Sequence, residues 1–207
     1  VDSPGPFDKE RDTYYNVTPL DNMTKKQKES WLREYNDYTL QILNIHEAIP
    51  GHYAQLVYSN KSPSLIKSIF RNGPTVEGWA VYSERMMLEQ GYGEDSQELW
   101  LMYYKWFLRV VTNTIIDYEI HNKDLSKKDA MKLMTVDAFQ EKAEAEAKWN
   151  RATVSQVQLA SYFAGFSEIY DLREKIKTEE GSDFDLKEFH ETFLSFGSAP
   201  IKEIKRL

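Results

Sequence analysis

The stretch His46-Glu47-Ala48-Ile49-Pro50-Gly51-His52 contains two of the four histidines of this 207-residue chain, with a glutamate directly after the first. Neutral imidazoles are good ligands for Zn²⁺, and a carboxylate beside the first ligand can take a proton from an attacking water. In the familiar His-Glu-x-x-His arrangement the second histidine comes four residues after the first, because about 400° of helical turn returns both rings to one face. Here the fourth position after His46 is Pro50.

His52 comes two residues later still, and an unbroken helix would turn it about 240° away from His46. Proline disrupts helical hydrogen bonding and glycine tolerates unusual backbone angles, so Pro50-Gly51 favours a bulge or kink. Such a bulge could absorb two extra residues and bring the rings together. The alternative is an ordinary kinked helix with two polar histidines, and the heptapeptide alone does not decide between them.

A second segment, Gly73 to Glu84, offers the third protein ligand that a catalytic zinc site requires. Glu77 and Glu84 are seven residues apart, so on a helix they share a face. We take Glu77 as the ligand and Glu84 as a residue that orients a metal-bound histidine through its other ring nitrogen. The alternative is two solvated glutamates on a surface helix, the usual place for this residue. Apolar neighbours such as Trp79 argue against full exposure of Glu77.

With these residues the sequence resembles the zinc hydrolases grouped as domain of unknown function 885, which are related to the gluzincin peptidases. That family carries a His-Glu-x-x-Pro-Gly-His motif and then a Glu-Gly-Trp-Ala segment, found here at His46 to His52 and at Glu77 to Ala80. Three further matches follow in the same order: Asp117 to His121, Gln158 to Gly165, and Phe184 to Pro200.

The resemblance covers nearly the whole chain and departs from the family pattern in two places. A second consecutive histidine is common in the family where this chain has Tyr53, which leaves His52 as the ligand. The segment Asn113 to Tyr118 also lacks the glycine that is usual there. Family members are usually much longer, so the resemblance implies that this chain is the C-terminal catalytic part of a longer protein. The missing N-terminal half of that protein is then an expected partner of this part.

Glu47 is the candidate general base, because it adjoins the ligand His46 and can reach the attacking water. The tetrahedral intermediate then needs a hydrogen-bond donor, and the resemblance to gluzincins suggests a tyrosine or a histidine. Tyr162, in the segment Gln158 to Gly165 that resembles the family, is the first candidate for this donor, and His121 is the second. The alternatives are a core tyrosine with a satisfied hydroxyl, and a histidine that interacts with the dipole at a helix end.

Three arginines could grip a substrate carboxylate with a bidentate guanidinium, although salt bridges are their commoner role: Arg109, Arg151 and Arg173. The fourth histidine, His190, lies far from the metal motifs in sequence and is expected to be structural or exposed.

Composition narrows the class of protein. Hydrophobic residues make up 41% of the chain and aromatic residues 14%, which excludes intrinsic disorder. No apolar run approaches the roughly 20 residues that span a bilayer. A net charge of −7 argues against a nucleic-acid partner. Cysteine is absent, so any metal must be held by His, Asp or Glu.

Helical periodicity predominates, and residues 1–207 are predicted to form one mainly α domain with at most a small β element. Residues 13–18 are the only strand-like piece, and a substrate could pair with them. The run Glu141 to Trp149, alternately alanine and charge, predicts a solvated helical face. Helices are expected at residues 24–35, 38–57, 62–70, 75–90, 96–121, 126 onward, 153–177 and 185–196.

The sequence therefore predicts a metallopeptidase with one zinc ion bound by His46, His52 and Glu77. The expected substrate is a peptide or small amide, with exopeptidase action on short peptides. The alternatives are a zinc hydrolase of another amide or an ester, and a non-catalytic helical interaction module with a degenerate site. The absence of cysteine fits either side of a bacterial membrane, and an extracytoplasmic location, periplasmic or as a lipoprotein, is the one favoured.

Overall fold

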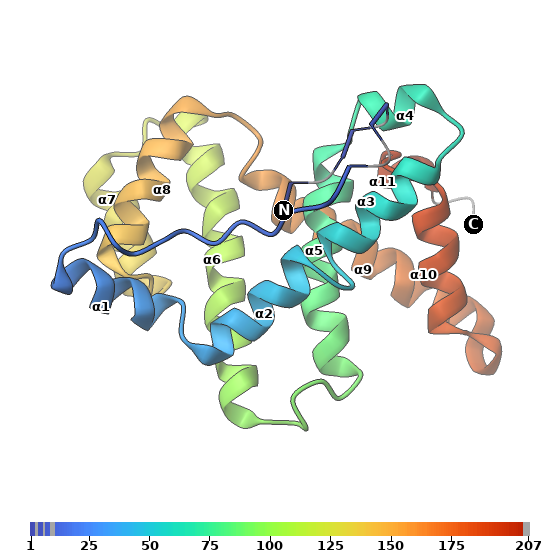
Figure 1. Cartoon of the computed structure of the whole chain (residues 1–207), viewed down its shortest axis with the longest axis horizontal. Coiled ribbons are helices and arrows are strands. Elements are labelled where there is room, and N and C mark those ends of the chain that lie inside the picture. The colour runs from blue at the N-terminus through green and yellow to red at the C-terminus, as the bar shows by residue number, and fades with distance from the viewer. Residues whose placement is uncertain (3, 6, 9–10, 205–207) are drawn as a thin grey trace. The chain divides into compact units, whose positions relative to one another are not determined.

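The computed structural model describes residues 1–2, 4–5, 7–8 and 11–204, and it is built of helices joined by turns (Figure 1). Within these residues there is one isolated β-bridge, between Asp2 and Tyr14, and no strand. The expected mainly α fold is confirmed. The strand expected at residues 13–18 is wrong, because only Tyr14 finds a backbone partner there, at 2.8 and 2.9 Å from Asp2.

Contacts between Cα atoms divide the chain into two compact units. Unit 1 consists of Val1–Asn16, Asn44–Glu84 and Ala164–Leu207. Unit 2 consists of Val17–Leu43 and Arg85–Phe163. Among the described residues, no helix is long and apolar enough to cross a membrane.

Two helices of the first half of the chain begin at capping residues that the sequence provides. Thr24 and Gln27 form a capping box at the start of the first helix, and the Ser96 side chain caps the longest one. The helices in this half are α1 (Lys25–Glu34), α2 (Asp37–Glu47), α3 (His52–Lys61), α4 (Leu65–Ile69), α5 (Gly73–Glu89) and α6 (Gln97–Asn122).

The second half is also helical. Its elements are α7 (Lys127–Lys132), the π-helical turn η1 (Leu133–Asp137), α8 (Lys142–Val154), α9 (Ala160–Glu180), the 3₁₀ turn η2 (Gly181–Asp183), α10 (Leu186–Ser195) and α11 (Ile201–Ile204). Asp185 caps α10, as its position in the sequence predicts. The helix expected at residues 153–177 begins later, at Ala160. The cause is the Asp117 carboxylate, which accepts hydrogen bonds from the N–H groups of Val157 and Ala160.

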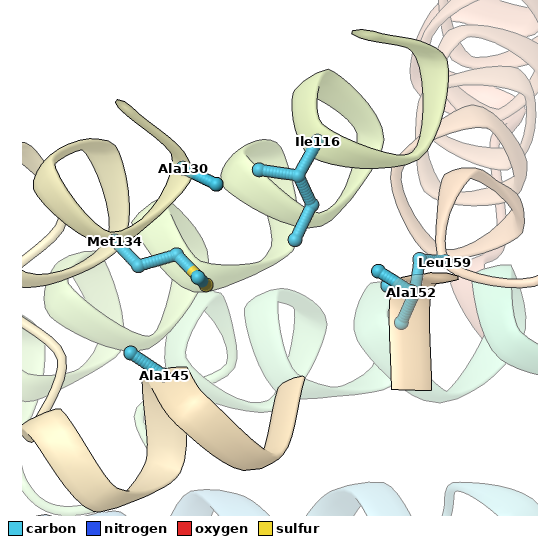
Figure 2. Close-up of a cluster of buried hydrophobic side chains, with 6 residues drawn as sticks. All are labelled: Ile116, Ala130, Met134, Ala145, Ala152 and Leu159. Atoms are coloured by element: carbon cyan, nitrogen blue, oxygen red, sulfur yellow. The ribbon is translucent and has the colours of Figure 1, made fainter. Parts of the chain in front are cut away.

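Unit 2 is organised around a hydrophobic cluster from α6, α7, η1, α8 and the residue that precedes α9 (Figure 2). Its fully buried members are Ile116, Ala130, Met134, Ala145, Ala152 and Leu159. The solvated face expected at residues 141–149 is therefore only partly correct. Ala145 and Lys148 are buried, and the Lys148 ammonium donates to the Asn113 side chain at 2.8 Å. The small alanine side chains allow α8 to pack closely in this cluster.

In unit 1, α3 packs against α4 and α10 (Figure 1). Gly78 of α5 and Gly165 of α9 lie so close that a Cβ on Gly78 would come within 2.3 Å of the Gly165 backbone. The segment after α10 connects two other elements of the unit. Ser198 bonds Gln55 of α3, and the Ala199 carbonyl accepts from Thr75 of α5 at 2.6 Å.

Candidate metal centre

The two histidines of the heptapeptide lie on either side of a break between helices. His46 is in the last turn of α2, His52 is the first residue of α3, and residues 48–51 connect them. The ring centroids are 4.7 Å apart, with the ring planes at 88°. The sequence predicts a bulge within one helix, whereas the chain leaves one helix and begins another. Both arrangements bring the rings together.

Gly51 makes this break possible. Its N–H donates to the carbonyl of Ile45 at 3.0 Å, so the connection folds back tightly on the end of α2. A Cβ at this position would lie 2.0 Å from the His46 carbonyl oxygen and 2.3 Å from that of Ile45. Both are backbone atoms and cannot rotate away, so only glycine fits.

Glu77 approaches both histidines from α5. Its Oε2 atom lies 3.4 Å from His52 Nε2 and 3.9 Å from His46 Nε2. One ligand atom from each of the three residues lies within 4.8 Å of the others. Ligands of a tetrahedral zinc site, each about 2.0 to 2.1 Å from the ion, are roughly 3.3 to 3.5 Å apart. The donor set and its spacing therefore fit a zinc ion with small adjustments, and all three residues belong to unit 1.

Glu84 lies seven residues after Glu77 on α5, about two helical turns further along. It contacts the ring nitrogen of His46 that faces away from Glu77. Its Oε1 atom lies 2.6 Å from His46 Nδ1, and the glutamate has no exposed surface. This is the orienting contact expected from the sequence. Burial disfavours the charged form of His46, but the hydrogen bond and charge of Glu84, with Glu77 and Glu47, outweigh it and raise the pKa of His46.

Glu47 ends α2 directly after the candidate ligand His46. Its side chain is about a quarter exposed, and its Oε2 atom lies 3.1 Å from the backbone nitrogen of Val1. Burial and the negative charge of Glu47 raise the pKa of the nearby Tyr15 hydroxyl. The carboxylate thus faces the N-terminal segment of unit 1.

The two oxyanion candidates belong to unit 2, while the candidate ligands belong to unit 1. Tyr162 receives a hydrogen bond from Arg151 at 3.5 Å. Both ring nitrogens of His121 are engaged: Nε2 lies 3.0 Å from the carbonyl oxygens of Ala152 and Ser155, and Nδ1 lies 3.4 Å from the Gln156 amide. These contacts give His121 a structural role at the end of α8. Its catalytic role and that of Tyr162 remain predictions.

The remaining candidates make ion pairs or aromatic contacts. Arg109 is paired with Glu34 and Glu144 inside unit 2. Arg173, in unit 1, is paired with Glu174 and stacks on the Tyr170 ring at 4.4 Å. These contacts favour the structural role that is commoner for arginine.

His190 is half-buried, with its Nε2 atom 2.7 Å from the Tyr82 hydroxyl. Its ring packs edge-on against Trp79. The expectation of a structural or exposed histidine agrees with these contacts.

Two residues that contact the elements of the site were not predicted from the sequence. The indole of Trp79 donates to the Pro50 carbonyl at 2.8 Å, and the Ser198 hydroxyl lies 3.2 Å from that of Ser59 in α3. The only signal for Trp79 is its place in the Glu77 to Ala80 segment. The only signal for Ser198 is its place in the segment Phe184 to Pro200, which does not indicate a contact with α3.

A cavity of about 840 Å³ lies in unit 1 beside the site. Ala48 and Tyr53, each next to a residue of the candidate site, contribute to its lining. Val57, Asn60 and Lys61 continue the Tyr53 face of α3, and the segment Arg11 to Tyr15 also lines the cavity.

Comparison with known proteins places the chain in a family. The family model described as "Bacterial protein of unknown function (DUF885)" matches residues 1–207. The solved structure of a predicted lipoprotein of unknown function from Shewanella oneidensis is 66% identical, with a TM-score of 0.92, over 99% of this chain and 37% of that one. A predicted lipoprotein from Colwellia psychrerythraea is 28% identical, with a TM-score of 0.80, over 84% of this chain and 30% of that one.

The chain thus spans well under half the length of either similar structure. The curated proteins include no match to it. Since the family model covers all 207 residues, the chain belongs to the DUF885 family of bacterial proteins.

Proposed function

We propose that this chain is a zinc-dependent hydrolase of peptide bonds, related to the gluzincin peptidases. The observation that carries the proposal is the convergence of His46, His52 and Glu77, whose ligand atoms lie within 4.8 Å of one another. Two imidazoles and one carboxylate are a ligand set of zinc peptidases, in which three protein ligands leave a fourth position for water or substrate. One zinc ion per chain is expected.

A bound zinc ion would supply a Lewis acid that activates water and polarises the scissile carbonyl. Glu47 would accept the proton of the attacking water and then donate it to the leaving amine. Glu84 would hold the His46 ring in place, and Tyr162 remains the proposed donor to the oxyanion.

Short peptides are the proposed substrates. The cavity beside the site, about 840 Å³, is within the range of about 300 to 1,000 Å³ that is usual for small ligands. Tyr14, Tyr53 and Val57 provide apolar surface for side chains. Lys61, eight residues after Tyr53 on α3, adds a positive charge about 12 Å further along the helix axis. That charge would suit the C-terminal carboxylate of a short peptide, in agreement with exopeptidase action.

An extracytoplasmic location is proposed as well. The Shewanella and Colwellia proteins are both described as predicted lipoproteins, and the first shares 66% identity with this chain. A periplasmic or lipid-anchored peptidase is consistent with that description.

Elemental analysis of protein purified without chelator tests the metal. One zinc per chain is expected, and His46→Ala, His52→Ala and Glu77→Ala should each lose it. His121→Ala serves as the control, because this histidine bonds backbone carbonyls of unit 2. Undiminished zinc in the first three variants would contradict the ligand assignment.

Digestion of a peptide library by the natural protein tests the reaction. Glu47→Gln should retain zinc and lose about 10² to 10⁴-fold in hydrolysis, because the amide cannot accept a proton. Glu179→Gln, on an exposed part of α9, is the matched control. Turnover of esters or other amides in place of peptides would indicate another zinc hydrolase. Bound zinc without turnover of any substrate would indicate a binding module.

A further inference from the structure

The indole of Trp79 connects α5 to the four-residue connection between the two candidate histidine ligands. Its Nε1–H group donates to the Pro50 carbonyl at 2.8 Å. Trp79 is 1% exposed and lies two residues after the candidate ligand Glu77. Pro50 lies two residues before His52. One hydrogen bond therefore joins the helix that carries one ligand to the turn that precedes another.

The Trp79 ring is itself held on several sides. Phe193 of α10 stacks on it at 5.5 Å with nearly parallel planes, at 14°. His190 of the same helix meets it edge-on, with ring centroids 5.4 Å apart, and Tyr82 lies against it at 5.5 Å. A buried aromatic ring with such neighbours has little rotational freedom. The position of the indole N–H is therefore fixed by the core of unit 1.

Apart from the Trp79 bond, the connection is held mainly by backbone bonds at its two ends. Ile49 is 66% exposed and contributes no buried apolar contact that would anchor the turn. The Ala48 N–H donates to the Asn44 carbonyl at 2.9 Å, the Gly51 N–H donates to the Ile45 carbonyl at 3.0 Å, and the Gly51 carbonyl accepts from Gln55 at 3.1 Å. The bond from Trp79 adds the Pro50 carbonyl, which lies between these positions. A shift of this turn would change the distance between the rings of His46 and His52, now 4.7 Å apart.

We propose that Trp79 is a positioning residue for the metal centre: its N–H group, by binding the Pro50 carbonyl, sets the spacing of His46 and His52. This inference rests on the proposed zinc site and adds a requirement to it. The hydrogen-bond donor of Trp79 matters for the metal, apart from the volume of the ring. Residues that do not bind a metal themselves but hold its ligands in position typically contribute about 10 to 100-fold to metal affinity.

The test removes the donor and keeps the ring. Replacement of Trp79 by 3-benzothienylalanine, through suppression of an amber codon, exchanges the N–H for sulfur in a ring of almost the same shape. The same replacement at Trp100 is the control, because Trp100 belongs to unit 2 and contacts Arg85, Tyr103 and Tyr104. Two quantities are measured in the parent and both variants: the zinc dissociation constant by competition with a chelating dye, and the hydrogen-exchange rate of the Gly51 amide without metal.

At Trp79 the replacement should weaken zinc binding about 10-fold or more and speed Gly51 exchange by a similar factor, with both unchanged at Trp100. Zinc affinity within twofold of the parent would overturn the inference while leaving the zinc site itself intact. If the parent binds no zinc, the proposed function fails, and the exchange rate then decides whether Trp79 holds the connection. Faster exchange of Gly51 would support the positioning role, and unchanged exchange would overturn it.

Discussion

The Nδ1 atom of His46 lies 2.6 Å from Oε1 of Glu84, a carboxylate with no exposed surface. A carboxylate only accepts, so Nδ1 carries the proton, and in the neutral ring Nε2 presents its lone pair on the side of Glu77, 3.9 Å away. A hydrogen bond of this kind fixes the orientation of a ligand ring and makes the other nitrogen more basic. The buried glutamate thus orients the ring of His46, as the proposed role of this residue as a zinc ligand requires.

Glu84→Gln should therefore reduce zinc affinity by about 10-fold, because an amide keeps the shape of the side chain and loses its charge. In the zinc-free protein the pKa of His46 should fall, since burial would no longer be offset by that carboxylate. Competition with a chelator and NMR titration of the imidazole measure the two effects. Glu89→Gln, on the same helix and paired with Arg85, is the control. An unchanged zinc affinity in Glu84→Gln would show that His46 does not depend on this partner.

Gly51→Ala should destabilise the protein and weaken zinc binding together. The new Cβ would lie 2.0 Å from the His46 carbonyl oxygen, so the connection must move and take His52 with it. Overpacking of this kind costs about 1 to 3 kcal/mol. Urea unfolding and zinc competition measure the two losses, and Gly5→Ala, with no atom within 4 Å of its Cβ, is the control. Full zinc affinity in Gly51→Ala would mean that His52 is not positioned by this turn.

Much of the local structure could be predicted because its causes are local. Thr24, Ser96 and Asp185 cap helices that begin one residue later, and each is a residue type that favours the capping position. The end of α5 at Glu89 follows from Gly91, which has a φ of +86°. The proximity of His46, His52 and Glu77 was predictable for another reason, since zinc chemistry requires these residue types near one another.

Other features depend on residues far apart in the sequence. The start of α9 is fixed by Asp117, 40 residues before Val157, and no pattern around residue 153 indicates it. The close approach of Gly78 and Gly165 and the bond from Trp79 to Pro50 likewise require the folded chain. Residues 13–18 have the composition of a strand, but strand formation needs a partner, and within the described part of the chain only Tyr14 has one.

Tyr162→Phe should lower kcat far more than it changes KM, if the hydroxyl donates to the oxyanion in the transition state. Loss of one such donor typically costs about 2.7 to 4 kcal/mol, or roughly 10² to 10³-fold in kcat. Zinc content should stay at the parent level, since the candidate ligands are unaltered. Thermal unfolding of the same preparation provides the control. A lower Tm with an unchanged kcat would mean that the hydroxyl contributes to stability, through contacts such as its bond with Arg151, and does not donate to the oxyanion.

His190 should make the protein less stable in mild acid. Burial, with a smaller effect from the charge of Arg173, lowers its pKa from the ordinary 6.5 to about 4. The folded state therefore holds this ring neutral, while the unfolded chain takes up a proton as the pH falls below 6.5. The resulting stabilisation is complete above pH 6.5 and is lost as the pH falls toward 4, and its size is about 2 to 3 kcal/mol.

His190→Gln isolates this effect, because glutamine does not titrate and can still meet the Tyr82 hydroxyl that lies 2.7 Å from the imidazole. The free energy of unfolding of both zinc-free proteins would be measured in urea at several values between pH 7 and 4.5. Groups common to both proteins, including His46 with its raised pKa, cancel in the difference. The parent should lose about 2 to 3 kcal/mol relative to the variant over this range. A difference that does not change with pH would mean that the imidazole is as easily protonated in the folded protein as in the unfolded chain, and that its contacts with Trp79 and Tyr82 do not depend on a neutral ring.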